Sequence, residues 1–327
     1  MKNRSKVLAG GTALATTTLA LANSLLDKYF KKGSIGVDEL SFIKDESIQS
    51  LARRNRDEAI EWFQDSNKEE IFLRSYDGLR LHGFLIENKN TDNYIIFSHG
   101  MWSNLEGSLS IACKFERYGY NILVFDHRGC GKSEGEYSTI GYRESFDLIQ
   151  WINYLAKNRP NSKICLHGVS MGAASVCIAL GTKLPLNVKC AISDCSFSSL
   201  KEEIESVTSK QYHLPLGPIS KIIDVLIKKK YGFSYKDVDP YNALKANTTP
   251  ILFVHGTADD FVPFEMAKIL YDASSNSVRK YYPVKDKGHG QACFDDNYYS
   301  NINSFIKEYL RWRNFLENFL SLFKEAA

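Results

Sequence analysis

The sequence contains eight short apolar runs, and this pattern restricts the folds that the chain can adopt. From the third run onward, most of the runs are separated by stretches long enough to form a helix. Each run is wholly apolar or alternates with a period of two residues, which is typical of buried and half-buried strands. The runs occupy residues 70–76, 79–87, 93–100, 121–129, 162–170, 188–195, 250–256 and 278–284. Amphipathic stretches with a helical period lie at 105–118, 141–157, 171–182 and 264–274. This alternation predicts an α/β fold with a mostly parallel sheet, covered by helices on both faces.

Two segments depart from the alternation. The connection over residues 196–249 is too long for a simple crossover, and it contains helical patterns near 199–210 and 218–230. We expect a small helical lid there, over the carboxyl edge of the sheet; the alternative is an enlarged surface excursion. Residues 299–325 predict one long amphipathic helix, packed on the sheet rather than on a membrane.

The composition is that of a globular protein and excludes one class of partner. Of the 327 residues, 44% are hydrophobic, which is ample for a buried core. The net charge is +3, but the first 32 residues carry six cations and one aspartate, which leaves the rest of the chain at about −2. Such a chain lacks the clustered cations that displace counterions from phosphates, so we expect no nucleic-acid partner.

The seven cysteines predict neither a disulfide framework nor a metal site. Their number is odd, their spacing is irregular, and the sequence has no C-x-x-C or H-x-x-x-H pattern. Cys165 and Cys177 lie in apolar runs, where they are expected to be small buried hydrophobic residues. We expect no metal and no cofactor.

Residues 7–26 carry no charge and are flanked by three cations on each side, and the stretch is long enough to cross a bilayer. We expect an uncleaved signal anchor; the alternatives are a signal peptide cleaved at Ala-Leu-Ala, residues 20–22, and an ordinary apolar helix. An anchor places the protein at the cell membrane with its folded domain outside the cytoplasm, whereas the alternatives make it secreted or cytoplasmic. The expected organisation is an anchor and linker over 1–35, a helical lead-in over 36–67 and a main domain over 68–327.

The segment GCGKSEG, residues 129–135, matches two catalytic patterns and fits neither. A phosphate-binding loop needs a glycine where this chain has Asp126, whose carboxylate would repel phosphate. A G-x-S-x-G elbow needs a helix directly after the serine, and the residues after Ser133 are typical of a loop. We expect this segment to be scaffold, in which Asp126 and Arg128 hold neighbouring loops by charge-assisted hydrogen bonds.

A second match, GVSMG at residues 168–172, has the required context. It follows the apolar run KICLH and leads directly into a run of helix-forming and small residues. Gly168 and Gly172 leave room for a strand and a helix to pass closely around a serine in a strained conformation. We therefore predict that Ser170 is a nucleophile; the alternative is a turn serine.

A serine nucleophile needs a histidine base and an acid that orients it. After such an elbow, the acid follows a late strand and the histidine comes last in the chain. Asp259 follows the strand at 250–256, and of the seven histidines only His289 lies beyond it. We predict that Asp259 is the acid and His289 the base, although His289 has the alternative of a solvated loop residue. Asp260 and Asp194 are rival acids.

The oxyanion that forms during attack on a carbonyl needs two preorganised donors. The backbone N–H of Met171 is one candidate, because it directly follows the nucleophile. The other is the N–H of Met101, in the loop after the strand at 93–100. Trp102 is expected to form a wall of the substrate pocket, with core packing as the alternative.

The motifs SHGMWSN, DHRGCGKSEG, GVSMGAAS, HGTADDFVP and KGHG occur in this order, and through them the chain resembles the α/β-hydrolase superfamily. It resembles most closely bacterial serine hydrolases with a prolyl-oligopeptidase-like or serine-aminopeptidase-like catalytic domain, over about residues 68–315. The resemblance implies an eight-stranded sheet whose second strand is antiparallel, with residues 196–249 as a lid. Gram-positive proteins of this kind often carry an N-terminal membrane-spanning segment.

The resemblance implies a hydrolase of small esters or peptides. We expect an esterase that forms an acyl-enzyme on Ser170, which water activated by His289 then hydrolyses. An aminopeptidase, amidase or acyltransferase with the same residues is the alternative, although no acidic pair recognisable as an amine-binding site is evident. The alternative of another class is a binding module that retained the fold without turnover.

Overall fold

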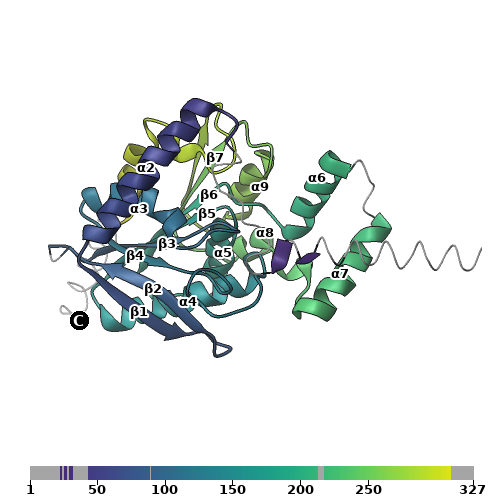
Figure 1. Cartoon of the computed structure of the whole chain (residues 1–327), viewed down its shortest axis with the longest axis horizontal. Coiled ribbons are helices and arrows are strands. Elements are labelled where there is room, and N and C mark those ends of the chain that lie inside the picture. The colour runs from purple at the N-terminus through teal and green to yellow at the C-terminus, as the bar shows by residue number, and fades with distance from the viewer. Residues whose placement is uncertain are drawn as a thin grey trace, which may run out of the picture.

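The computed structural model describes residues 23, 26, 27, 29–31, 43–88, 90–212 and 217–310, and its centre is an eight-stranded sheet (Figure 1). The strands are β1 (Lys68–Arg74), β2 (Arg80–Ile86), β3 (Asn93–Ser98), β4 (Asn121–Phe125), β5 (Lys163–Val169), β6 (Val188–Asp194), β7 (Ile251–Gly256) and β8 (Arg279–Val284). Their order in the sheet is β1-β2-β4-β3-β5-β6-β7-β8. Strand β2 is antiparallel to both of its neighbours, and every pair from β4 to β8 is parallel. The predicted sheet, with its antiparallel second strand, is confirmed.

Helices cover both faces of the sheet, as the alternation of strands and helices predicts (Figure 1). Those of the main body are α2 (Glu46–Asp65), α3 (Glu106–Arg117), α4 (Tyr142–Asn158), α5 (Met171–Leu180), α8 (Pro240–Leu244), α9 (Glu265–Ala273) and a C-terminal helix that is described over residues 298–310. Successive residues of one strand enter opposite cores. Ile95 and Phe97 pack with α3 and the C-terminal helix, whereas Tyr94 and Ile96 pack with α4 and α5. Burial on both faces explains why these strands are continuous apolar runs.

Helix α2 lies within the predicted lead-in over 36–67, and it shares the core of the main domain. The Asp45 side chain caps its first turn by accepting a hydrogen bond from the Ser47 N–H at 2.8 Å. Ala59 is fully buried in the same cluster as strand β3, and Glu58 pairs with Arg117 of α3 at 2.6 Å. The helix thus packs on α3 and covers one face of the sheet.

Residues 196–249 contain two helices close to the predicted positions, α6 (Leu200–Tyr212) and α7 (Gly217–Tyr231). Figure 1 shows both helices standing off the body, beside the described N-terminal residues 26, 27 and 29–31. An apolar cluster joins this insertion to the body: Ile227, Tyr231 and Phe233 pack with Phe197 and with Met171, the residue after Ser170. The insertion therefore sits beside the elbow, where a lid is expected.

Within the described ranges, no helix combines the length and the apolar character needed to cross a bilayer. The predicted anchor over 7–26 lies outside the described residues except for Asn23 and Leu26, as does the part of the predicted C-terminal helix beyond residue 310. All seven cysteines are free thiols, and Cys165 and Cys177 are fully buried, as predicted.

Candidate active site

Ser170 occupies a sharp turn between β5, in the middle of the sheet, and α5. Its backbone angles are φ 56° and ψ −121°, a conformation that costs a non-glycine residue about 1–3 kcal/mol. A Cβ atom on Gly168 would lie 2.4 Å from the Gly172 carbonyl oxygen, and one on Gly172 would lie 2.0 Å from the Ser98 carbonyl oxygen. Only glycine fits at both positions, so strand and helix can close around the serine as the motif predicts.

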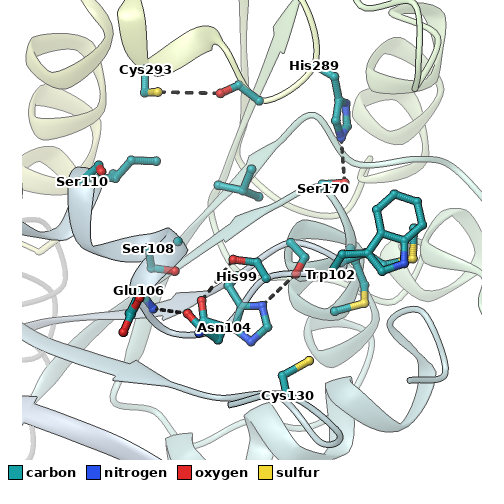
Figure 2. A pocket seen from close by; sticks show the side chains of 18 of the residues that line it. His99, Trp102, Asn104, Glu106, Ser108, Ser110, Cys130, Ser170, His289 and Cys293 are labelled. Atoms are coloured by element: carbon teal, nitrogen blue, oxygen red, sulfur yellow. Dashed lines mark hydrogen bonds between the residues drawn. The ribbon is translucent and has the colours of Figure 1, made fainter. Parts of the chain in front are cut away.

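The three predicted site residues meet at the carboxyl edge of the sheet. The Nε2 atom of His289 lies 2.8 Å from the Ser170 Oγ atom, and its Nδ1 atom lies 2.8 Å from Asp259 Oδ2. Figure 2 shows the imidazole pointing at the Ser170 hydroxyl. Asp259 is in the loop after β7 and His289 in the loop after β8. Because a carboxylate only accepts, the Nδ1 atom of His289 carries the proton, and Nε2 is free to accept the hydroxyl proton.

Two backbone groups and a second histidine also hold the Asp259 carboxylate. Its Oδ1 atom accepts hydrogen bonds from the N–H groups of Phe261 at 3.0 Å and Val262 at 2.9 Å. His255 Nε2 lies 3.1 Å from Asp259 Oδ2 and 3.1 Å from the Val262 carbonyl oxygen. Burial alone raises the pKa of Asp259, but the hydrogen bonds from His255 and His289 outweigh burial, so the pKa lies below its usual value. Asp259 is therefore ionised at neutral pH.

His255 is a site residue that the sequence analysis did not single out. It is fully buried in β7 and stands four residues before the acid. Since both of its contacts are acceptors, its Nε2 atom carries a proton. The only sign of this role in the sequence is that His255 lies at the end of the strand that precedes Asp259. Five of the seven histidines are followed by glycine, so the histidine-glycine pattern does not distinguish His255 from the others.

The two rival acids lie away from His289 Nδ1. Asp260 is exposed and pairs with Lys44 at 2.7 Å. Asp194 ends β6 and accepts a hydrogen bond from the Tyr298 hydroxyl at 2.8 Å, and that hydroxyl also contacts His167 at 3.0 Å. Burial raises the pKa of Asp194 to about 6. Asp194 thus belongs to a buried polar network behind the site, with different partners from those of Asp259.

The segment GCGKSEG is part of a charged scaffold, as predicted. Arg128 donates to Asp147 at 2.6 Å and to Asp77 at 2.9 Å, which ties the loop to α4 and to the turn after β1. The Asp126 carboxylate folds over the loop so closely that a Cβ atom on Gly131 would lie 2.2 Å from it. A carboxylate therefore occupies the place where a phosphate would bind.

A family model described as serine aminopeptidase, S33, matches residues 89–231. An uncharacterized Bacillus subtilis protein, YqkD, is 28% identical over 92% of this chain and 97% of its own length. The esterase Pf2001 of Pyrococcus furiosus has the same fold, with a TM-score of 0.62 and 22% identity over 75% of this chain and 92% of its own. The chain has the α/β-hydrolase fold and is similar in sequence to a family of α/β hydrolases.

A further relative is a yeast protein named as an uncharacterized membrane protein, YNL320W of Saccharomyces cerevisiae. It is 24% identical over 73% of this chain and 80% of its own length.

The two predicted oxyanion donors lie beside Ser170. Met171 is the first residue of α5, so its backbone N–H has no acceptor within the helix. Met101 follows Gly100, where a Cβ atom would lie 3.7 Å from the Ser170 Cβ atom. Both methionines line the cavity that contains Ser170. Their role as donors remains a prediction.

A cavity of about 550 Å³ opens beside Ser170 and His289 (Figure 2). The half-buried Trp102 forms part of its wall, with ring centroids 5.7 Å from Tyr29 and 6.5 Å from Phe261. The Phe261 ring in turn lies 5.0 Å from the His289 ring. The structure therefore places Trp102 at the pocket rather than wholly in the core. An aromatic wall of this kind suits an apolar acyl group.

The far wall of the cavity is polar, and sequence analysis did not assign it. It is formed by residues of α2, of the loop before α3 and of α3 itself, including Asn55, Arg56, Asn104, Glu106 and Ser110. Helix α2 precedes the first strand, so only packing across the sheet brings it to the site. This wall offers polar groups to a bound ligand.

One group of possible metal ligands occurs among the described residues, and it overlaps the site. Ligand atoms of Cys195, Asp259 and His289 lie within 4.8 Å of one another. Asp259 and His289 already bond to each other. Burial raises the pKa of the Cys195 thiol well above its usual value, which keeps it protonated and makes it a poor ligand. These residues fit proton transfer better than metal binding.

Proposed function

We propose that this protein is a serine esterase, in which Ser170, His289 and Asp259 form the catalytic triad. The observation that carries the proposal is the continuous hydrogen-bonded chain from Ser170 Oγ through His289 to Asp259, with both distances at 2.8 Å, at the wall of a cavity. The Pyrococcus relative of the same fold is itself named an esterase.

In this mechanism, His289 Nε2 takes the Ser170 proton while Oγ attacks the ester carbonyl carbon. The backbone N–H groups of Met101 and Met171 stabilise the oxyanion. His289 then gives its proton to the leaving alcohol, and an acyl-enzyme remains. Water, deprotonated by the same histidine, releases the acid and restores Ser170. Throughout the cycle Asp259 stabilises the imidazolium and fixes its orientation.

The second candidate is an aminopeptidase or amidase with the same triad, and the description of the matching family model favours it. A peptidase of this kind needs a carboxylate to bind the substrate ammonium group. Glu106 is the one acidic residue among the described residues that line the cavity. An acyltransferase, in which an alcohol replaces water, and a binding module without turnover are the remaining alternatives.

A fluorophosphonate probe tests the proposed nucleophile. We expect the wild-type protein to be labelled and Ser170→Ala to lose both labelling and ester hydrolysis, because within the described ranges Ser170 supplies the hydroxyl that bonds to His289. Ser133→Ala, which changes the serine of the rejected elbow, is the control and should keep the label. Labelling that persists in Ser170→Ala, or a wild-type protein that does not react with the probe, would contradict the proposal.

A panel of p-nitrophenyl esters and aminoacyl anilides separates the two candidate activities. We expect kcat/KM for the esters to exceed that for the anilides, since an anilide needs better protonation of its leaving group and an ammonium-binding carboxylate for recognition. Anilides that turn over faster than esters would favour the peptidase.

We also propose that residues 7–26 anchor the protein in the cell membrane, with the folded domain outside the cytoplasm. The proposal is supported by their length, lack of charge and flanking cations, and by the printed name of the yeast relative. Alkylation of cysteines in intact cells with an impermeant reagent tests the orientation. Cys130, which is partly exposed, should react only if the domain is outside.

Removing the second histidine should lower the kcat/KM profile around neutral pH. In His255→Phe, Asp259 loses a donor that lowers its pKa, but this pKa lies well below its usual value and the carboxylate stays ionised at neutral pH. Activity falls because the carboxylate is held less firmly against His289 Nδ1 and stabilises the imidazolium less well. The loss should be about tenfold, the equivalent of one hydrogen bond.

His255→Gln is the matched control, since its Nε2 atom can donate from a similar place and should restore the wild-type profile. A His255→Phe profile that equals the wild type would show that His255 only fills space.

A further inference from the structure

Residues directly after the apolar stretch line the catalytic cavity. Tyr29, Phe30 and Lys31 border the same cavity as Ser170 and His289. Tyr29 is the third residue after residue 26, the last of the uncharged stretch, and this length of chain spans at most about 10 Å. Leu26, the last residue of that stretch, is buried in the same apolar cluster as Phe30 and Tyr231, so the stretch meets the folded domain close to the cavity.

Specific contacts hold this N-terminal arm against α7. Phe30 is 3% exposed and stacks on Tyr231 with ring centroids 4.9 Å apart. Asp27 accepts a hydrogen bond from the Tyr231 hydroxyl at 2.6 Å and pairs with Lys230 at 2.5 Å. The Phe30 carbonyl oxygen accepts from the Ser138 N–H at 2.8 Å. The arm, α7 and the cavity wall thus form one packed unit, so the position of the arm determines the position of α7.

The outward face of α7 combines apolar and cationic side chains. Ile222 is 54% exposed and Val225 is 62% exposed. The opposite face carries the buried Asp224 and Ile227. The exposed residues follow helical spacing along one side of the helix: Lys221, Ile222, Val225, Lys228 and Lys229. Apolar residues flanked by lysines are typical of helices that lie in the interface of an anionic bilayer.

We propose that this face of α7, which we call the α7 face, rests on the headgroups of an anionic bilayer, and that the enzyme hydrolyses esters of membrane lipids. The inference rests on the proposed esterase and its anchor. With the arm fixed at the cavity, an inserted anchor brings both the α7 face and the cavity to the membrane. Figure 1 shows α6 and α7 standing off the body on the side of the arm, which leaves them accessible to such a surface.

The cavity is suited to such a substrate. Its aromatic wall, with Phe30, Trp102 and Phe261, would take an acyl chain that leaves the bilayer, while the polar wall at Asn55 and Asn104 would take the lipid alcohol. In the reaction, the acyl carbon–oxygen bond breaks and the lipid alcohol leaves with a proton from the catalytic histidine. Water then releases the fatty acid, so one ester and one water give one alcohol and one acid.

The test compares a long-chain ester in vesicles with a soluble short-chain ester, using the full-length protein. The wild-type protein is reconstituted in phosphatidylcholine vesicles with or without phosphatidylglycerol. Its turnover is then measured with two substrates: 4-methylumbelliferyl oleate, which dissolves in the bilayer, and p-nitrophenyl butyrate, which dissolves in water. We expect the anionic lipid to raise turnover of the oleate and to leave that of the butyrate unchanged.

Variants of the α7 face should separate the two substrates. Ile222→Glu combined with Val225→Glu is expected to lower oleate turnover by about tenfold, since charged groups are expelled from the interface, with butyrate turnover unchanged. Lys221→Glu combined with Lys229→Glu should abolish the effect of the anionic lipid. Lys228 is left intact because it pairs with Asp224 within the helix.

The matched control changes two equally exposed apolar residues away from α7. Leu186 precedes β6 and Val278 precedes β8, so both lie at the amino ends of strands, opposite the active site. Replacing both with glutamate should change neither rate. If the α7 variants hydrolyse the oleate at the wild-type rate, or if phosphatidylglycerol has no effect, the inference is wrong while fluorophosphonate labelling can still support the esterase. If the wild-type protein is not labelled and hydrolyses neither ester, the proposed function itself is wrong.

Discussion

Replacing Asp259 with asparagine is expected to lower kcat/KM for ester hydrolysis by about 10⁴-fold, because a carboxamide can present its N–H to His289 and stabilise the wrong tautomer. In the wild type, Asp259 Oδ2 accepts the Nδ1 proton at 2.8 Å. An amide also fails to stabilise the imidazolium that forms during attack. Steady-state kinetics with a p-nitrophenyl ester measure the effect, and circular dichroism checks that the fold is retained.

Asp194→Asn is the matched control for this experiment, because Asp194 also ends a central strand and is buried. Its carboxylate bonds to Tyr298 and not to His289, and its pKa of about 6 reflects burial. We expect less than about a tenfold loss, in line with a residue that supports the site from behind. A larger loss in Asp194→Asn than in Asp259→Asn would mean that the acid has been assigned to the wrong strand.

The second large effect is on stability. Gly172→Ala is expected to reduce the free energy of unfolding by about 3 kcal/mol or more, or to prevent folding, because a Cβ atom there would lie 2.0 Å from the Ser98 carbonyl oxygen. The obstacle is backbone of β3, in the centre of the sheet, and it cannot move aside as a flexible side chain would. Urea unfolding followed by circular dichroism measures the loss.

Gly100→Ala provides the control for Gly172→Ala. A Cβ atom at Gly100 would meet the Val169 carbonyl oxygen at 3.6 Å, an ordinary contact, so the cost should stay below about 1 kcal/mol. Equal unfolding midpoints for wild type and Gly172→Ala would contradict the close passage of α5 and β3 that forms the elbow.

Much of the fold was predictable because its signals are local. A strand buried on both faces must be apolar throughout, and each helix must repeat its apolar face every 3.6 residues. The signal of the elbow is also local, since GVSMG lies within five residues. Gly168 is required by its contact with the helix that directly follows its strand, whereas Gly172 is required by its contact with Ser98 of β3. The chain order of nucleophile, acid and base narrowed the choice of site residues to Ser170, Asp259 and His289.

Other features depend on contacts between segments far apart in the sequence. Asp194 and Asp259 both follow parallel strands that are neighbours in the sheet, and only the path of the loop after β8 brings His289 to one of them. The support from His255 depends on how the loop after β7 turns back on its own strand. Neither turn leaves a periodic signal in the sequence.

The sequence by itself determined the strand and helix pattern, the strained serine and the order of its partners, because backbone geometry and hydrophobic periodicity act over a few residues. Only the tertiary structure decided which residues form the walls of the cavity. Helix α2 and the arm at residues 29–31 reach it from before the first strand. They do so because burying their apolar faces against α3 and α7 stabilises the fold, and such packing between distant segments is not encoded at any single position.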